Sequence, residues 1–258
     1  MSDAAATTAR SGEPVAPSSS PASGSPAARG TARASAGRLA ATGLLGPLTA
    51  ALLVGALHVA PPTAAISPVR RTISEYALTG SAWAFNVAVV ALALGSLAIL
   101  VAAARAGLAR SSSAGFLLGL AWVGALLVVV VFPKHDWAVG PSTNGQIHRV
   151  ASLVAFACLP AAVMLLTRRR QAGPGVAPRW AFWLAAAGLA WFGTLIGAWL
   201  LSPVTGVPWY RALPIGLVER GLVLCEVGAV VALGVWVVSA TRRSRVPSAS
   251  PVRTAPAR

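Results

Sequence analysis

The feature that most constrains this chain is a series of six apolar stretches between Arg38 and Arg242. Each has about 19 or more residues with few or no charges, and a helix rising about 1.5 Å per residue needs around 20 residues to cross a hydrocarbon layer of ~30 Å. Open sheets and barrels are excluded, because lipid offers no partners for unpaired backbone groups and the stretches lack the alternation of barrel strands. The sequence therefore predicts an all-α integral membrane protein, a bundle of six transmembrane helices. The predicted spans are Leu39–Ala60, Ser81–Ala104, Ala114–Phe132, Gly145–Thr167, Trp180–Leu201 and Pro214–Ala240.

Both ends of the chain differ in composition from these spans. Residues 1–37 consist mainly of Ala, Ser, Gly, Pro and Thr, with almost no large apolar side chains to bury. A segment of that kind gains too little from burial to offset the entropy lost on folding. We therefore predict a disordered basic tail at residues 1–37, a transmembrane domain at 38–241 and a second disordered basic tail at 242–258.

The basic residues are concentrated on one side of the predicted helices. The formal net charge is +15, and 15 of the 21 arginines and lysines fall in the two tails and in the second and fourth loops, against four in the other loops. This distribution predicts a multi-pass protein of the cell (plasma) membrane with both termini cytoplasmic. It also accounts for the charge without nucleic acid, which we exclude as a partner because no base-reading motif accompanies the basic residues.

Two spans carry small residues at four-residue spacing, in Gly115-Phe-Leu-Leu-Gly119 and in Gly193-Thr-Leu-Ile-Gly197. Such spacing lets helix backbones approach each other closely. Packing within one chain and assembly into a homo-oligomer explain the pattern equally well, so both interpretations stay open.

Two loops carry the spacing of a capping box, a hydroxyl residue followed three positions later by Glu or Gln. Thr72-Ile-Ser-Glu75 predicts a short helix at about Ile73–Thr79, and Thr143-Asn-Gly-Gln146 predicts a cap for the fourth span. Both loops are therefore expected to be ordered.

Polar and ionisable residues gather on the predicted outer face. Glu219 and Glu226 are seven residues apart on one face of the sixth span, and ionisable groups at that depth should face protein or water rather than lipid. We expect Arg149 to face Glu219 across the outer ends of the fourth and sixth spans. The candidate ligand-binding residues are Arg149, Glu219, Arg220, His148, Ser74 and Glu75.

Other chemistries would draw on the same face. Ser74 as nucleophile, His148 as base and Asp136 or Glu75 as orienting acid form a candidate catalytic set. A metal site would use His58, His148 and Asp136, but no HxxxH, HExxH or CxxC spacing supports it, so no metal is predicted. No phosphate-cradling glycine loop or dinucleotide fingerprint is present, and no cofactor is predicted.

The order of the outer-face motifs over about Leu39 to Ala240 resembles the bacterial six-span membrane family catalogued as domain of unknown function 998. The motifs are Ile73-Ser74 before the second span, Phe132-Pro133 followed by Asp136 after the third, Gln146-Ile147-His148 opening the fourth and Gly216-Leu-Val-Glu219-Arg220 opening the sixth. The Ile-Ser loop and the outer histidine are also distantly similar to eukaryotic six-span proteins of the autophagy-modulator and lipid-anchor-remodelling type. That similarity implies a role in handling or sensing membrane lipids.

Three functions follow as hypotheses. The first is a non-enzymatic protein that binds or organises membrane lipids in an extracytoplasmic polar pocket, with Arg149 and Arg220 attracting the phosphates of anionic head groups. The alternative is a membrane-embedded lipid hydrolase or transferase, and the third is a small-solute transporter, weakened by the lack of visible internal repeats. Whether the protein is an enzyme stays open at this point.

Overall fold

The computed structural model describes residues 26–136, 138–168 and 175–243, and within them the chain is helical with no strand. The predictions made for residues 1–25 and 244–258 lie outside the described residues. The α-helices are α1 (Pro26–Gly43), α2 (Leu45–Val59), α3 (Ala82–Arg105), α4 (Ala114–Val131), α5 (Thr143–Thr167), α6 (Ala177–Thr205), α7 (Trp209–Ala212) and α8 (Ile215–Arg243). Two short 3₁₀ helices, η1 (Thr63–Ala65) and η2 (Ile73–Leu78), lie in the first loop.

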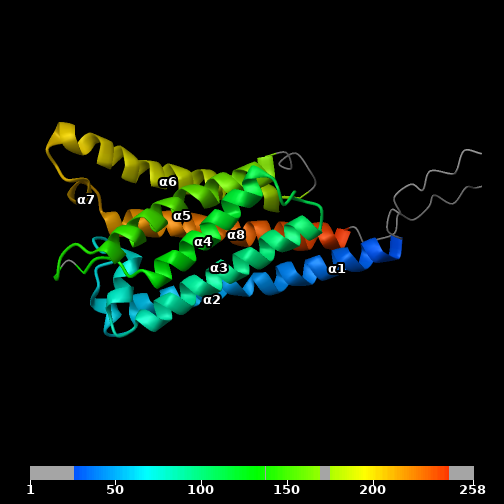
Figure 1. Ribbon diagram of the computed structural model, residues 1–258, viewed down its shortest axis with the longest axis horizontal. Helices are drawn as coiled ribbons and strands as arrows, with labels where there is room; N and C mark the ends of the chain where they lie inside the picture. Colours follow the sequence, from blue (N-terminus) through cyan, green and yellow to red (C-terminus); the bar gives the residue numbers. More distant parts are fainter. Residues whose placement is uncertain (1–25, 137, 169–174, 244–258) are drawn as a thin grey trace, which may run out of the picture.

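Six helical segments of the described chain are long and apolar enough to cross a membrane, which confirms the predicted six-helix membrane fold. The first of these segments is made of α1 and α2, which follow each other as one rod (Figure 1). The five others are α3, α4, α5, α6 and α8. The number and order of spans therefore agree with the apolar stretches of the sequence.

The first helix begins earlier than predicted. It starts at Pro26, so residues 26–37 are helical where a tail was expected. Alanine has the highest helix propensity of all residues, and the small side chains allow close packing: Ala36 and Ala40 are buried, and Gly37 lies against Thr241 of α8. The prediction looked only for large apolar side chains and overlooked packing through small ones.

One half of the bundle holds the first turns of α1 and the last turns of α8. Large fully buried side chains in this half include Ile99, Val163 and Val237. Helices α2 and α3 approach through glycines, because a Cβ on Gly46 would lie 2.7 Å from the Cα of Gly95. The ends of α1 and α8 lie together at this end (Figure 1). We refer to the opposite end, which carries the first, third and fifth loops, as the outer end.

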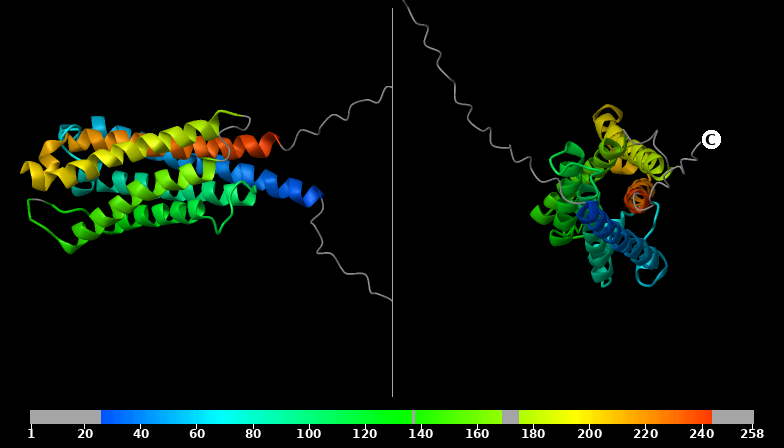
Figure 2. Two further views of the ribbon diagram at one scale, coloured as in Figure 1. Left: turned by 90° about the horizontal axis from the view of Figure 1, so that it is seen from above. Right: turned by 90° about the vertical axis from the view of Figure 1, so that its right-hand side faces the viewer.

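Helix α6 is packed over only part of its length. Its buried residues are Pro178, Ala181, Ala185 and Gly188, and none follows before it ends at Thr205. Figures 1 and 2 show its outer part leaning away from the other helices. This places the predicted small-residue motif of α6 on an open side, since Gly193 and Gly197 have no neighbouring atoms within 4 Å of an added Cβ.

The other small-residue motif is used inside the chain. Gly115 of α4 lies against Ala162 and Leu165 of α5, and Gly119 lies against Leu100 of α3. The interpretation as internal packing therefore holds for α4. A homo-oligomer built on the α6 motif stays a prediction.

Candidate functional site

A cavity of about 400 Å³ opens into the outer half of the bundle. Its walls come from α2, α3, α4, α5 and α8, and η2 covers its outer end. On each wall helix the lining extends for about seven residues, as from Glu219 to Glu226 on α8, which corresponds to a depth of about 10 Å. Most of the lining is apolar. The polar and aromatic-polar residues in the lining are His58, Ser74, Trp122, His148, Ser152, Glu219, Arg220 and Glu226.

The cavity has a lateral opening between α2 and α8. Ala51 and Gly55 on α2 and Leu224 on α8 line the cavity and are exposed, Leu224 to 75%. We refer to these three residues as the portal. It lies about one turn deeper than the contact between His58 and Arg220, at a depth where both helices have the composition of membrane spans. The portal therefore lies on the lateral surface of the bundle, between two of the candidate membrane spans.

Arg220 is the centre of the polar layer at the outer end. Its Nε donates to Nε2 of His58 over 2.7 Å, and Nη2 donates to the hydroxyl of Tyr76 over 3.3 Å. Its Nη1 donates to the carbonyls of Pro68 and Arg71, at 2.8 and 2.7 Å, and to that of Gly216. The guanidinium thus fastens the first loop to the start of α8, and most of its N–H groups are occupied within the protein.

These contacts determine which ring nitrogen of His58 carries the proton. An arginine can only donate, so Nε2 of His58 is an acceptor and the ring proton sits on Nδ1. Nδ1 donates to the carbonyl of Val54 over 2.7 Å. The ring also packs edge-on against Tyr76, with centroids 5.5 Å apart. Both ring nitrogens are engaged, so His58 supports the polar layer and has no free lone pair for a metal ion.

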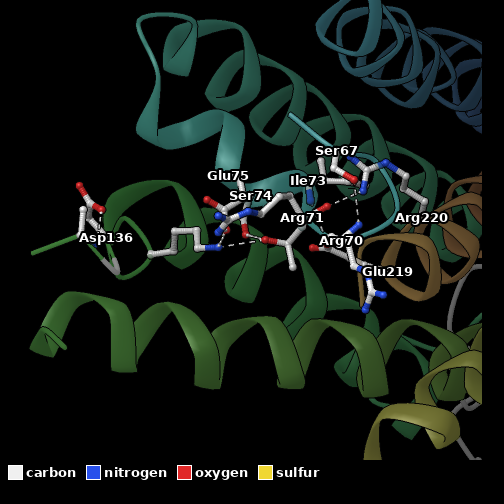
Figure 3. Close-up of polar contacts among 12 residues, drawn as sticks. Ser67, Arg70, Arg71, Ile73, Ser74, Glu75, Asp136, Glu219 and Arg220 are labelled. Atoms are coloured by element: carbon white, nitrogen blue, oxygen red, sulfur yellow. Dashed lines mark hydrogen bonds and ion pairs between the residues drawn. The ribbon is translucent and has the colours of Figure 1, made fainter. Parts of the chain in front are cut away.

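Glu219 joins the same layer from the neighbouring position on α8. Its Oε2 accepts the backbone N–H of Ile73 over 2.6 Å, which satisfies the first free donor of η2 (Figure 3). The predicted helix after Thr72 is therefore present, but the prediction that Thr72 caps it is wrong. Thr72 makes no side-chain cap, and a carboxylate from α8 takes its place.

Lys134 ties the third loop to the first. Its Nζ lies 2.7 Å from Oε1 of Glu75 and donates to the hydroxyl of Thr72 over 3.0 Å. The side chains of Lys134 and Glu75 are 12% and 18% exposed, so the ion pair is largely shielded from solvent. Thr72 in turn contacts the hydroxyl of Ser74 over 3.1 Å. We refer to η2, which covers the cavity, as its roof. Glu75 therefore helps to hold the roof in place and is not part of the cavity lining.

His148 is buried in the second turn of α5. Its Nδ1 lies 2.9 Å from the carbonyl of Phe132 and 3.2 Å from that of Val129. Both partners are acceptors, so Nδ1 carries the proton and Nε2 of the neutral ring keeps a lone pair. The cap of this helix is Ser142, whose Oγ accepts the N–H of Gly145, and not the predicted Thr143.

The inner limit of the cavity, which we refer to as the floor, is formed by Trp122 and Glu226. They are 1% and 5% exposed. Nε1 of Trp122 and Oε1 of Glu226 are buried and have no hydrogen-bond partner among the described residues. Buried polar groups in native proteins are usually paired, so the floor differs sharply from the saturated outer layer.

Five of the predicted site residues meet at the cavity: His58, Ser74, His148, Glu219 and Arg220. The inward stripe predicted for the sixth span is confirmed, because Glu219 and Glu226 both line the cavity. Asp136 is exposed, and its Oδ1 accepts the N–H of Ala138 (Figure 3). It lies outside the cavity lining, and the structure does not bring Ser74, His148 and Asp136 together.

The expected pairing of Arg149 with Glu219 is wrong. Arg149 is exposed, and its Nη2 donates to Oε1 of Gln146 one turn earlier over 2.6 Å. One position separates Arg149 from His148, and a step of about 100° turns it from the cavity to the outer surface of α5. Arg149 is not part of the cavity lining.

Three residues of the site were missed by sequence reasoning: Tyr76, Trp122 and Lys134. Lys134 had a detectable signal, since it is the single lysine of the chain and lies in a loop otherwise poor in basic residues. Tyr76 and Trp122 carry no such signal, because an aromatic residue in or beside a span is usually packing or an interfacial anchor.

Within the described residues, no group of three or more His, Cys, Asp or Glu side chains is placed to hold a metal ion. His58 and His148 line the cavity, but each has its ring bonded to protein groups and Asp136 lies apart. The alternative zinc set therefore does not come together in this part of the chain.

The chain was compared with known proteins at three levels. A family model described as protein of unknown function (DUF998) matches residues 30–236, which is most of the chain and includes every residue of the cavity. No curated protein and no solved structure matches it.

Proposed function

We propose a function from the premise that this chain belongs to the DUF998 family of membrane proteins of unknown function: it binds a membrane amphiphile, with the apolar chain in the cavity and the polar head beneath η2. The observation that carries the proposal is the combination of an apolar cavity with a portal on the lateral surface of the bundle, where we infer that the hydrocarbon layer lies. A ligand could then move between bilayer and cavity without crossing water.

The size and lining of the cavity support an acyl chain as the occupant. About 400 Å³ falls within the range of roughly 300–1,000 Å³ typical of small-molecule sites. The middle of the cavity is lined by apolar side chains such as Val54, Leu92 and Val223. Burial of an acyl chain against them brings little hydrophobic gain over lipid, so we infer that selectivity comes from the polar groups at the two ends.

The outer layer favours an uncharged or weakly polar head group. Arg220 gives its N–H groups to His58, Tyr76 and three carbonyls, which leaves little for a phosphate. Arg149 lies outside the cavity on the exposed side of α5. Recognition of an anionic head group stays a proposal for Arg149 at the membrane surface and is separate from the cavity.

Blocking the portal tests this proposal. Gly55 of α2 has no atom within 4 Å of an added Cβ, and the same holds for Gly124 on the exposed side of α4. Gly55→Phe should fill the portal and reduce binding of mono-oleoyl-glycerol at least tenfold, measured by native mass spectrometry of the purified protein in detergent. Gly124→Phe, the same change on a helix face outside the cavity, should bind like the wild type. Equal binding by both variants would refute lateral binding.

A lipid hydrolase is the second candidate, favoured by one observation. His148 lines the cavity, and two carbonyls fix its proton on Nδ1, so Nε2 is held as a potential general base. Ser74 also lines the cavity, although its hydroxyl contacts Thr72. A bound ester near these two groups could be attacked by Ser74 or by water.

The two candidates respond differently to His148→Gln. Glutamine is close to histidine in size and keeps an amide donor, so lipid retention should change little under the binding proposal. Under the hydrolase proposal, release of labelled fatty acid should fall by 10²-fold or more, because glutamine cannot accept the proton. Absence of any turnover by the wild-type protein would eliminate the hydrolase.

A further inference from the structure

The floor of the cavity holds two polar groups of opposite kind. Oε1 of Glu226 can accept a hydrogen bond, and Nε1–H of Trp122 can only donate one. Both atoms are buried without partner among the described residues, and both residues line the cavity. An unpaired polar group inside a membrane protein is costly, since neither lipid nor apolar side chains can replace the lost hydrogen bonds.

Trp122 and Glu226 both stand near the inner end of the cavity lining on their helices, α4 and α8. Trp122 also lines a second, deeper cavity of about 10 Å³, whose wall on α8 begins at Val230, one turn beyond Glu226. Trp122 therefore borders both spaces, and Glu226 lines only the larger one. The small cavity has almost entirely apolar walls, such as Ile99 and Leu233, so it offers the two groups no partner.

The charged groups that line the cavity do not compensate Glu226. The nearest cation along α8 is Arg220, six residues away and so about 9 Å along the helix axis. Its guanidinium is engaged with His58, Tyr76 and the first loop. Glu219 is bonded to Ile73 at the outer end. The partner of Glu226 and Trp122 is therefore to be sought in the ligand.

We propose that Trp122 and Glu226 form a second polar subsite that binds a hydroxyl group carried in the middle of the ligand's acyl chain. A hydroxyl accepts one hydrogen bond and donates another, so a single group satisfies both the indole N–H and the carboxyl oxygen. A plain hydrocarbon chain would pair neither, and an ammonium group would pair the carboxyl alone. This inference rests on the proposed lipid-binding function and narrows it to hydroxylated amphiphiles.

Two lipids that differ in one hydroxyl test the subsite. Mono-ricinoleoyl-glycerol carries a hydroxyl midway along the chain, and mono-oleoyl-glycerol lacks it. The full-length protein in detergent should bind the hydroxylated lipid about tenfold more tightly, because the plain chain leaves buried polar groups unpaired. Glu226→Leu and Trp122→Phe should each bring the ratio of the two affinities close to one.

Two further variants control for damage to the fold. Glu226→Gln keeps the acceptor oxygen and the size of the side chain, so it should preserve most of the preference. Ser152→Ala removes another hydroxyl of the cavity lining, one already bonded to the carbonyl of His148 over 2.9 Å, and should leave the ratio unchanged. A loss of preference in Ser152→Ala equal to that in Glu226→Leu would overturn the assignment to the floor.

The outcomes distinguish failure of the hydroxyl subsite from failure of the proposed lipid-binding function. Equal affinity of the wild type for both lipids, with both lost in Gly55→Phe, would overturn the hydroxyl subsite and leave lipid binding standing. Binding of neither lipid, or binding that Gly55→Phe does not weaken, would overturn the proposed function itself and the subsite with it.

Discussion

The polar side chains at the two ends of the cavity differ in whether the protein supplies their hydrogen-bond partners. At the outer end, Arg220 and Glu219 of α8 are bonded to His58, Tyr76 and the first loop. At the floor, Oε1 of Glu226, two turns deeper on α8, and Nε1 of Trp122 on α4 have no hydrogen-bond partner among the described residues. Polar groups in the outer layer stabilise the fold, and those at the floor cost stability. Unpaired polar groups of this kind point to a ligand more strongly than a saturated cluster does.

This contrast also changes the role that we assign to the charged residues at the outer end. Arg220 is the most connected side chain of the site, and its contacts hold the roof of the cavity rather than a ligand. A residue that binds ligand should have free groups before the ligand arrives. By that criterion the floor, and His148 with its free Nε2, are better placed to act on a ligand than the arginines.

The largest effect on stability should follow from Arg220→Met. The change leaves His58, Tyr76 and three carbonyls without their donor, and we expect a loss of about 3 kcal/mol or more. Arg149→Met is the matched control, since that arginine is exposed and donates to Gln146 one turn earlier, and its cost should be below about 0.5 kcal/mol. Thermal unfolding in detergent measures both. Similar losses for the two arginines would contradict the structural role of the outer layer.

A smaller effect is expected for Lys134→Met. The change removes the ion pair with Glu75 and the hydrogen bond to Thr72, both largely shielded from solvent, and should cost about 1 kcal/mol. Because η2 covers the cavity, this variant should also show faster amide exchange in η2, read by hydrogen–deuterium exchange, than the control Arg149→Met. Unchanged exchange would mean that Lys134 does not hold the roof.

The fold could be predicted because each membrane span is recognisable from its own stretch of sequence. A run of about 20 apolar residues has one stable structure in lipid, so the number and order of helices followed from residues 38–241 alone. The start of the first helix at Pro26 did not follow, because it depends on distant contacts: Ala36 is buried, and Gly37 lies against Thr241 of α8, more than two hundred residues away in the chain.

The site was predicted in part of its residues and missed in its contacts. Ser74, His148, Glu219 and Arg220 all line the cavity, because polar residues at the ends of spans turn inward. The sequence could not show that Glu219 caps η2 instead of pairing with Arg149. Such pairings depend on the rotation of each helix and on the geometry of the loops. A shift of one residue along a helix can move a side chain from the cavity to the surface, as His148 and Arg149 demonstrate.

Thermal unfolding of Glu219→Leu and Glu226→Leu, each with and without mono-ricinoleoyl-glycerol, tests the central contrast most directly. Glu219→Leu should lower the Tm in both conditions, because the N–H of Ile73 loses its acceptor. Glu226→Leu should keep or raise the Tm of the lipid-free protein, since it removes an unpaired buried carboxyl, and should lose most of the stabilisation that the lipid gives the wild type. A fall in the lipid-free Tm of Glu226→Leu as large as that of Glu219→Leu, with lipid stabilisation intact, would contradict the account.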